Sequence, residues 1–152
     1  VHCAAVRTMA EWTEVNGMMV RDTFFTNVFS GIFLTNICSS YMQKRGGGHV
    51  VLFGSGSINS SPPGTALYAA SKSAIDTYSR VVAQELEKFK VYLNCIWPGA
   101  KTRLNPESTS EPHDIANFIS DLVQMEKWGN VYSVEGKEWC YVGERAYAFN
   151  EE

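Results

Sequence analysis

Two short apolar runs separated by a long helical stretch are the feature that most limits the folds open to this chain. His49–Phe53 is almost entirely apolar and bounded by glycines, and Val91–Trp97 is closed by Pro98-Gly99. Runs of this length and composition are typical of strands buried in a parallel sheet. Between them, Ala66–Phe89 carries apolar residues at helical spacing. A strand, a crossover helix and a second strand predict a right-handed βαβ unit, and hence an α/β fold with a parallel sheet.

Further helical and extended patterns flank this unit. A helix is predicted from Met19 to Lys44, because apolar residues recur there every three or four positions and glycines follow its basic end. The run Val1–Val6 is predicted to be the end of a buried strand. A third helix is expected over Pro112–Lys127, with the proline in its first turn. A late strand is expected over Asn130–Tyr141, with Gly136 as a candidate turn.

Composition excludes several classes of function. The chain has 152 residues, which suits one domain, and 45% of them are hydrophobic and 19% charged. A net charge of −3 disfavours nucleic acid as a partner. No apolar run reaches the about 18–20 residues that a membrane span needs. The four cysteines (Cys3, Cys38, Cys95 and Cys140) lack the spacing of metal ligands, so no bound metal is expected. We expect them to be reduced thiols, as in a cytoplasmic protein.

Tyr68 and Lys72 are the first candidates for chemistry. They lie four residues apart on a predicted helix and therefore share one of its faces. A cation held near a phenol favours the phenolate and lowers the pKa of the phenol. Such a pair can exchange a proton with a substrate oxygen near neutral pH. The same spacing also occurs on ordinary helix surfaces, so the surrounding residues have to decide between the two interpretations.

Polar loops follow both predicted strands. Gly54-Ser55-Gly56-Ser57 follows the first strand, and Pro98-Gly99-Ala100-Lys101-Thr102 follows the second. In open parallel sheets, ligands bind at the carboxyl ends of the strands. We therefore expect a serine, a tyrosine, a lysine and a threonine to converge at this edge of the sheet.

Four motifs, taken in order, resemble the signatures of the short-chain dehydrogenase/reductase family. They are Asn27 in Asn27-Val28-Phe29-Ser30-Gly31, then Ser55, then Tyr68-x-x-x-Lys72, and finally Pro98-Gly99. Ser55 lies thirteen residues before the tyrosine, which is the usual spacing in the ordinary, non-extended branch of that family. The resemblance covers Val1 to about Thr102 and continues more loosely to Val134. It implies a Rossmann-like, doubly wound parallel sheet, with residues 1–152 as the C-terminal part of a single NAD(P)-binding domain.

The resemblance also implies roles for individual residues. Tyr68 would be the general acid/base, Lys72 would hydrogen-bond the nicotinamide ribose, and Ser55 would donate to the substrate oxygen, with Ser57 as its rival. Asn27 would help to hold a water that links Lys72 to solvent, unless it is an ordinary polar residue of its helix. The candidate catalytic residues are Asn27, Ser55, Tyr68 and Lys72. The candidate cofactor-binding residues are Ala4, Ala5, Tyr68, Lys72, Pro98, Gly99 and Thr102, and the cofactor would be NAD or NADP.

The sequence departs from the family pattern at its N-terminal side. The family's Asn-Asn-Ala-Gly stands here as His2-Cys3-Ala4-Ala5. No strand, glycine-rich turn and helix N-terminus that could cradle a pyrophosphate come before Val1. We therefore expect the first three strands of the family's sheet to be missing from this chain. The residue that would choose between NAD and NADP is missing with them.

Two functions from different classes fit these observations. One is an NAD(P)-dependent oxidoreductase that interconverts a carbonyl and a secondary alcohol on a small-molecule substrate. The other is a truncated, non-catalytic relative that acts as a subunit or scaffold. In either case the resemblance implies a homodimer or homotetramer formed through the two long helices, with Phe24, Phe33, Tyr78 and Val82 as candidate contacts.

Overall fold

The computed structural model describes residues 1–60, 62–99, 101, 105–106, 108, 111–126, 128–134 and 138–142. Its sheet has four strands in the order β1 (Gly48–Phe53), β2 (Val91–Trp97), β3 (Gly129–Val134) and β4 (Glu138–Val142). β1, β2 and β3 are parallel, and β4 returns antiparallel to β3. The predicted parallel α/β architecture is therefore confirmed. The single late strand predicted over residues 130–141 is in fact this antiparallel pair, and the candidate turn at Gly136 lies outside the described residues.

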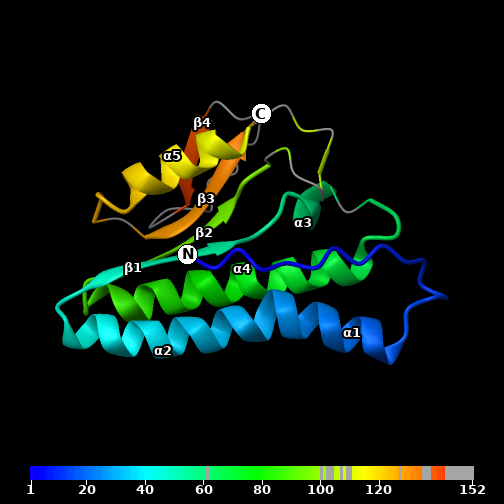
Figure 1. Ribbon diagram of the computed structural model, residues 1–152, viewed down its shortest axis with the longest axis horizontal. Helices are drawn as coiled ribbons and strands as arrows, with labels where there is room; N and C mark the ends of the chain where they lie inside the picture. The colour runs from blue at the N-terminus through cyan, green and yellow to red at the C-terminus, as the bar shows by residue number, and fades with distance from the viewer. Residues whose placement is uncertain are drawn as a thin grey trace, which may run out of the picture.

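Helices cover both faces of the sheet (Figure 1). One continuous helical stretch runs through α1 (Gly17–Phe24), the π-helical turn η1 (Phe25–Phe29) and α2 (Ser30–Lys44), and it lies beside α4 (Ala66–Glu87). α5 (Pro112–Leu122) covers the opposite face, and the short α3 (Ser57–Ser60) stands above the start of α4. The predicted third helix therefore ends at Leu122, before the expected Lys127.

Alternation along the strands explains this layering, because successive side chains of a strand point to opposite faces. Val50, Leu52, Leu93 and Cys95 form one buried cluster together with Ile75 and Ala83 of α4. On the other face, Val51 and Ile96 pack against Leu122, Phe118 and Ile119 of α5. The edge of the sheet where β1 and β2 end therefore lies beside the first turns of α4.

Local chemistry fixes both ends of the first helical stretch. The Asn16 side chain accepts hydrogen bonds from the backbone N–H groups of Met18 and Met19, which satisfies donors that the helix leaves open. After α2, Gly47 adopts φ +134, and a Cβ there would lie 2.6 Å from the Lys90 carbonyl oxygen. Only glycine allows the chain to turn into β1 at this close approach.

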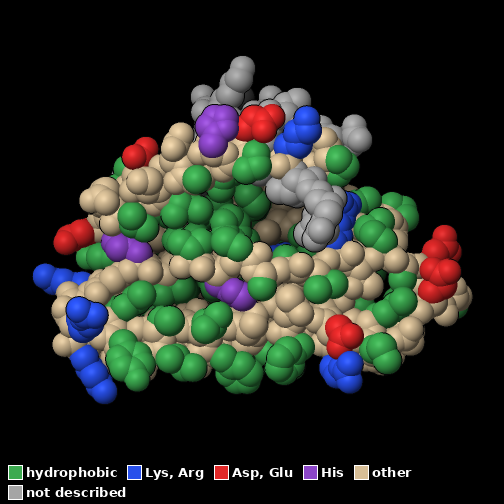
Figure 2. Space-filling model, in the orientation of Figure 1, with side chains coloured by type: hydrophobic (Ala, Val, Ile, Leu, Met, Phe, Trp, Pro, Cys, Tyr) green, Lys and Arg blue, Asp and Glu red, His purple; other side chains and the backbone are tan. Residues whose placement is uncertain are grey.

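The first helical stretch presents its apolar stripe outward. Small or polar residues at steps of four face inward and are buried, namely Thr23, Asn27, Gly31, Thr35 and Ser39. The exposed stripe consists of Phe25, Phe29, Phe33, Ile37 and Tyr41. We call it the outer apolar stripe, and Figure 2 shows apolar side chains gathered along the lower edge of the molecule, over these helices.

The expected strand over Val1–Val6 is wrong. None of these residues belongs to a strand, and Val1 is 70% exposed. The segment meets the free edge of β1 at one backbone contact, in which the His2 N–H donates to the Val51 carbonyl at 2.9 Å. A single hydrogen bond does not make a ladder. In the part of the chain that the structure describes, no helix is both long and apolar enough to cross a membrane, and no group of acidic, histidine and cysteine side chains could hold a metal ion.

Candidate active site

Tyr68 and Lys72 lie in the first turns of α4, directly below the ends of β1 and β2. Both are buried, with 8% and 3% of their surfaces exposed. The Lys72 ammonium stands 5.8 Å from the centre of the Tyr68 ring. It donates a hydrogen bond of 2.8 Å to the carbonyl of Phe53, the last residue of β1. The helix spacing thus brings the two side chains together, and the strand end fixes the ammonium.

Burial lowers the pKa of Lys72 to about 8, because few solvent dipoles reach its ammonium. The negative charge of a Cys95 thiolate would oppose this effect, but burial raises the pKa of Cys95 to about 12. The Cys95 thiol is therefore neutral near pH 7 and leaves the ammonium without that counter-charge. None of the ion pairs found among the described residues includes Lys72.

Asn27 links three parts of the chain. It lies buried in the π-helical turn, and its carboxamide accepts from the Val6 N–H and donates to the Val6 carbonyl, each at 2.8 Å. The same amide nitrogen donates to the Ser71 hydroxyl at 2.9 Å, and that hydroxyl donates to the Tyr68 carbonyl. π-helical turns often occur at functional sites. Asn27 therefore fixes the N-terminal segment against the helix that carries the tyrosine and the lysine.

His2 supplies a second link between the N-terminal segment and the first helical stretch. Its Nε2 lies 2.7 Å from the Ser30 hydroxyl, which itself donates to the Thr26 carbonyl. The Ser30 oxygen therefore accepts from the Nε2–H of the ring. Burial lowers the pKa of His2, and the nearby charge of Lys72 lowers it further.

Ser55 and Ser57 occupy the loop after β1. Ser55 is half-buried, and its hydroxyl accepts a hydrogen bond of 3.2 Å from the Ser57 backbone N–H. Ser57 is the first residue of α3, whereas Ser55 lies in the short loop between β1 and α3. α3 in turn contacts α4, which begins just before Tyr68.

The remaining candidate cofactor residues lie at the same edge or beside it. Pro98 is half-buried after β2, and Gly99 is exposed with φ +53, so its backbone can approach a ligand closely. Ala4 is exposed and Ala5 half-buried, and they immediately precede the Val6 that Asn27 holds. Thr102 lies outside the described residues.

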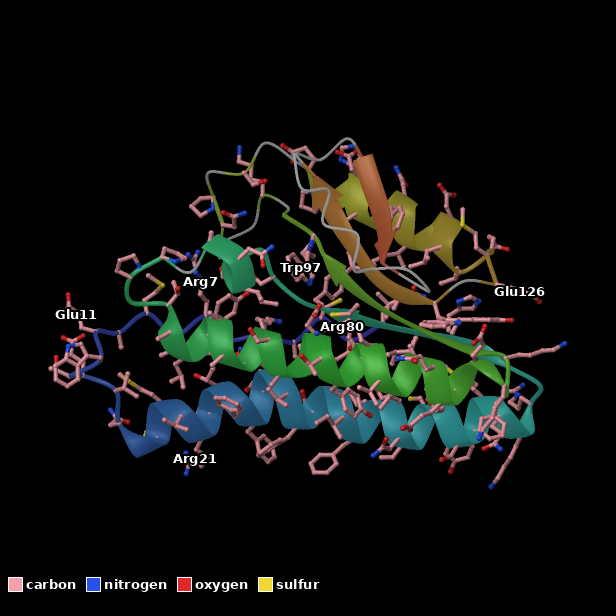
Figure 3. The ribbon with its side chains drawn as sticks, turned by 180° about the vertical axis from the view of Figure 1, so that it is seen from behind. Arg7, Glu11, Arg21, Arg80, Trp97 and Glu126 are labelled. Carbon is pink, nitrogen blue, oxygen red and sulfur yellow. The ribbon has the colours of Figure 1, made fainter. Side chains whose placement is uncertain are left out.

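The structure adds a buried polar pair that the sequence interpretation missed. The indole N–H of Trp97 donates to Oδ1 of Asp76 at 2.9 Å, and Oδ2 of the same carboxylate lies 3.4 Å from Nε of Arg80. Trp97 lies between β2 and α4 (Figure 3). Asp76 comes one turn after Lys72 on the same helix face, and this spacing was the available signal.

Comparisons with known proteins indicate one family. The family model of short chain dehydrogenases matches residues 1–112. The dehydrogenase/reductase SDR family member 4 of Caenorhabditis elegans is 28% identical over 113 residues, which cover 74% of this chain and 44% of that protein. The human protein of the same name is 35% identical over 119 residues, which cover 66% of this chain and 43% of that protein. The chain therefore spans less than half the length of these relatives.

A solved structure supports the fold independently. A 4-hydroxyisoleucine dehydrogenase complexed with NADH and succinate superposes with a TM-score of 0.79 at 22% identity, covering 89% of this chain and 66% of that one. Since the family model matches well over half of the sequence, the chain belongs to the short-chain dehydrogenase/reductase family. The Rossmann-like fold class predicted from the sequence is confirmed.

Proposed function

We propose that this chain carries the proton-transfer site of an NAD(P)-dependent oxidoreductase that interconverts a carbonyl and a secondary alcohol. The observation that carries the proposal is the buried Tyr68–Lys72 pair at the carboxyl end of a parallel sheet. Membership of a family of dehydrogenases and reductases supports it. Residues 1–152 as the C-terminal part of one cofactor-binding domain, and a cytoplasmic location, stay predictions.

The residues at this edge fit a nicotinamide cofactor. Lys72 has three N–H donors, and its one hydrogen bond in the described part of the chain goes to Phe53. Two donors therefore remain for the hydroxyls of a ribose. Gly99 offers exposed backbone in the loop after the neighbouring strand β2. Such a cofactor, when bound, supplies or accepts the hydride. One structural neighbour was solved with NADH, and for this chain the choice between NAD and NADP stays open.

The chain's own groups would handle the proton. In the reductive direction the Tyr68 hydroxyl gives its proton to the substrate oxygen as that oxygen gains negative charge. The neighbouring Lys72 ammonium stabilises the phenolate left behind. The Ser55 hydroxyl, at the strand end, donates a hydrogen bond to the same oxygen. Asn27 orients the helix by holding Ser71.

A tyrosine substitution in the full-length protein tests this function. Tyr68→Phe should lower kcat for carbonyl reduction by about 10²–10⁴-fold, because the general acid is lost. Binding of NADH or NADPH, followed by cofactor fluorescence, should persist. Tyr92→Phe, a change of the same kind near the start of β2 and away from the strand ends, is the matched control. Failure of the unmodified protein to bind either cofactor would reject the proposal and favour the non-catalytic scaffold.

The outer apolar stripe supports a further part of the proposal, namely that two copies of the chain associate through their long helices. Five large apolar residues at steps of four are exposed along one helix face. Phe25 and Phe29 already stack edge to face at 6.3 Å. Contiguous apolar surface of this kind marks association sites. Phe33, at the centre of the stripe, is the residue on which we expect the contact to depend most.

A further inference from the structure

We propose that Trp97 and Asp76 form a positioning pair, which holds Ser55 at the distance from Tyr68 that proton transfer requires. The inference rests on the proposed function, because it assigns these two residues a task in the same site. Neither residue touches the reacting atoms in this scheme. Both act through the backbone that carries Ser55.

Trp97 contacts Gly54, the glycine that precedes Ser55. A Cβ placed on Gly54 would lie 2.4 Å from Cδ1 and 2.5 Å from Nε1 of the Trp97 indole. The indole therefore lies directly against the Gly54 α-carbon. Gly54 also donates its backbone N–H to the Ile96 carbonyl at 2.9 Å, one residue before the tryptophan. The end of β2 thus supports the start of the serine loop through both backbone and ring.

Asp76 anchors the Trp97 indole. Trp97 and Asp76 are both buried, and the indole N–H donates to the carboxylate at 2.9 Å. This bond fixes the ring orientation, since an indole has a single N–H to donate. Arg80 holds the other carboxylate oxygen from the next turn of α4. The position of the ring is thereby set relative to the helix that carries Tyr68 and Lys72.

Burying the Asp76 carboxylate costs free energy of folding. A buried carboxylate loses the solvation it has in water, and an apolar side chain of similar volume often stabilises a fold as well as a buried ionic group does. Tight packing of the indole on Gly54 does not by itself need a charged anchor. The hydrogen bond from the indole N–H to Asp76 specifies the orientation of the ring, which packing alone specifies less well. The pair therefore suits a task that depends on geometry.

Together these contacts form one path from α4 to the serine loop. It runs from Asp76 to the Trp97 indole, from the indole to Gly54, and on to Ser55. Tyr68 lies two turns before Asp76 on the same helix. Because misplacing a catalytic group by about 1 Å can cost about 10²-fold in rate, a device that fixes this separation affects kcat.

Three substitutions in the full-length protein test the pair. Asp76→Ala removes the acceptor, and Trp97→Phe removes the N–H but keeps a ring. Each should lower kcat by about 10–100-fold at temperatures where the variant is folded. Asp76→Asn retains an oxygen that can accept from the indole, and it should restore most of the loss. Asp22→Ala, which removes an exposed carboxylate from α1, is the matched control.

A merely structural role predicts a different pattern. If Asp76→Ala lowers Tm but leaves kcat of the folded protein unchanged, or if Asp76→Asn is as slow as Asp76→Ala, the inference is overturned. If Asp76→Ala does not fold, the comparison of Trp97→Phe with Asp76→Asn decides.

A second readout does not depend on activity. Exchange of the Gly54 amide and the chemical shift of the Ser55 amide should change in Asp76→Ala and stay close to wild type in Asp76→Asn, and exchange of the Gly54 amide should also change in Trp97→Phe. If the unmodified protein shows no turnover, the proposed function fails, and this amide readout still tests the pair. Unchanged amide signals in Asp76→Ala, or unchanged exchange of the Gly54 amide in Trp97→Phe where Asp76→Ala does not fold, would overturn the positioning role in that case too.

Discussion

Replacing Lys72 by methionine should change how the stability of the protein depends on pH. The substitution keeps a long, flexible side chain and removes the buried ammonium. Burial lowers the pKa of Lys72 from 10.5 to about 8. Between these two values the unfolded chain keeps the proton and the folded chain has released it. The unfolded state therefore binds more protons there, and stability rises as the pH rises.

The magnitude follows from the same two pKa values. Each pH unit of separation corresponds to about 1.4 kcal/mol, so keeping the ammonium charged in the folded protein costs about 3 kcal/mol near pH 7. Relief of this cost should stabilise the wild type by about 1 kcal/mol between pH 7 and pH 9, and by about 2.5 kcal/mol between pH 7 and pH 10. Lys72→Met lacks this rise. Loss of the hydrogen bond to Phe53 adds an offset that does not vary with pH.

Urea unfolding of both proteins at pH 7, 8, 9 and 10 measures the effect. Other groups titrate in this range, so the informative quantity is the difference between wild type and variant at each pH. Lys44→Met, which removes an exposed lysine at the end of α2, is the control and should show a flat difference. A flat difference for Lys72→Met as well would show that burial does not desolvate this ammonium in the folded protein.

Three further predictions concern packing, hydrogen bonding and assembly. Gly54→Ala should lower the free energy of unfolding by about 1–3 kcal/mol because the new methyl meets the Trp97 indole. Adding Trp97→Leu in the same chain should recover part of that loss. Asn27→Ala should lower the free energy of unfolding in urea by about 2–4 kcal/mol, because the N–H and the carbonyl of Val6 both lose the side chain that they bind. Asn36→Ala, at an exposed position, should cost far less, and equal losses would contradict the hydrogen-bond account. Phe33→Asp should shift the protein toward monomer in analytical ultracentrifugation, whereas an unchanged mass would remove the helix face from the interface.

The strands of the core could be predicted because their signal is local. β2 has the predicted bounds Val91–Trp97, and β1 begins one residue before the predicted start at His49. Both strands are buried between helices, so nearly every residue in them is apolar. The segment Val1–Val6 has a similar composition and is not a strand. Its one hydrogen bond to β1 depends on the geometry of a distant part of the chain, which composition does not report.

Periodicity predicted the first long helix but not its orientation. The recurrence of apolar residues located a helix over residues 19–44, and the helix observed spans residues 17–44. The strongest apolar stripe faces outward, and the buried face carries Thr23, Thr35 and Ser39. Small residues let this helix approach α4 closely, and a Cβ on Gly31 would lie 3.1 Å from Cδ1 of Ile75. An apolar stripe indicates a contact, and it does not specify whether the contact is with the core or with another chain.

In the candidate site, too, contacts between residues close in sequence could be predicted and contacts between distant residues could not. Spacing along one helix was enough to pair Tyr68 with Lys72, and the strand end puts Ser55 two residues after Phe53, whose carbonyl accepts from Lys72. The contact of Asn27 with Val6 and that of Trp97 with Asp76 join residues about twenty positions apart in sequence. Nothing local distinguishes a tryptophan that closes a strand by packing from one that also donates a hydrogen bond.

α4 departs from the usual pattern of an amphipathic helix on the face that it turns toward the sheet. An amphipathic helix usually buries an apolar stripe. Here Tyr68, Lys72 and Asp76 follow one another at steps of four and are all buried, whereas Val81 on the same helix is exposed. Burial acts against the charged form of both ionisable partners, since it lowers the pKa of Lys72 and raises the pKa of Asp76. A fold selected for stability alone would place apolar side chains at these positions. Under the proposed function, substitutions of Tyr68, Lys72 and Asp76 should affect catalysis more than stability, whereas substitutions of the core residues Ile75 and Ala83 on the same helix should affect mainly stability.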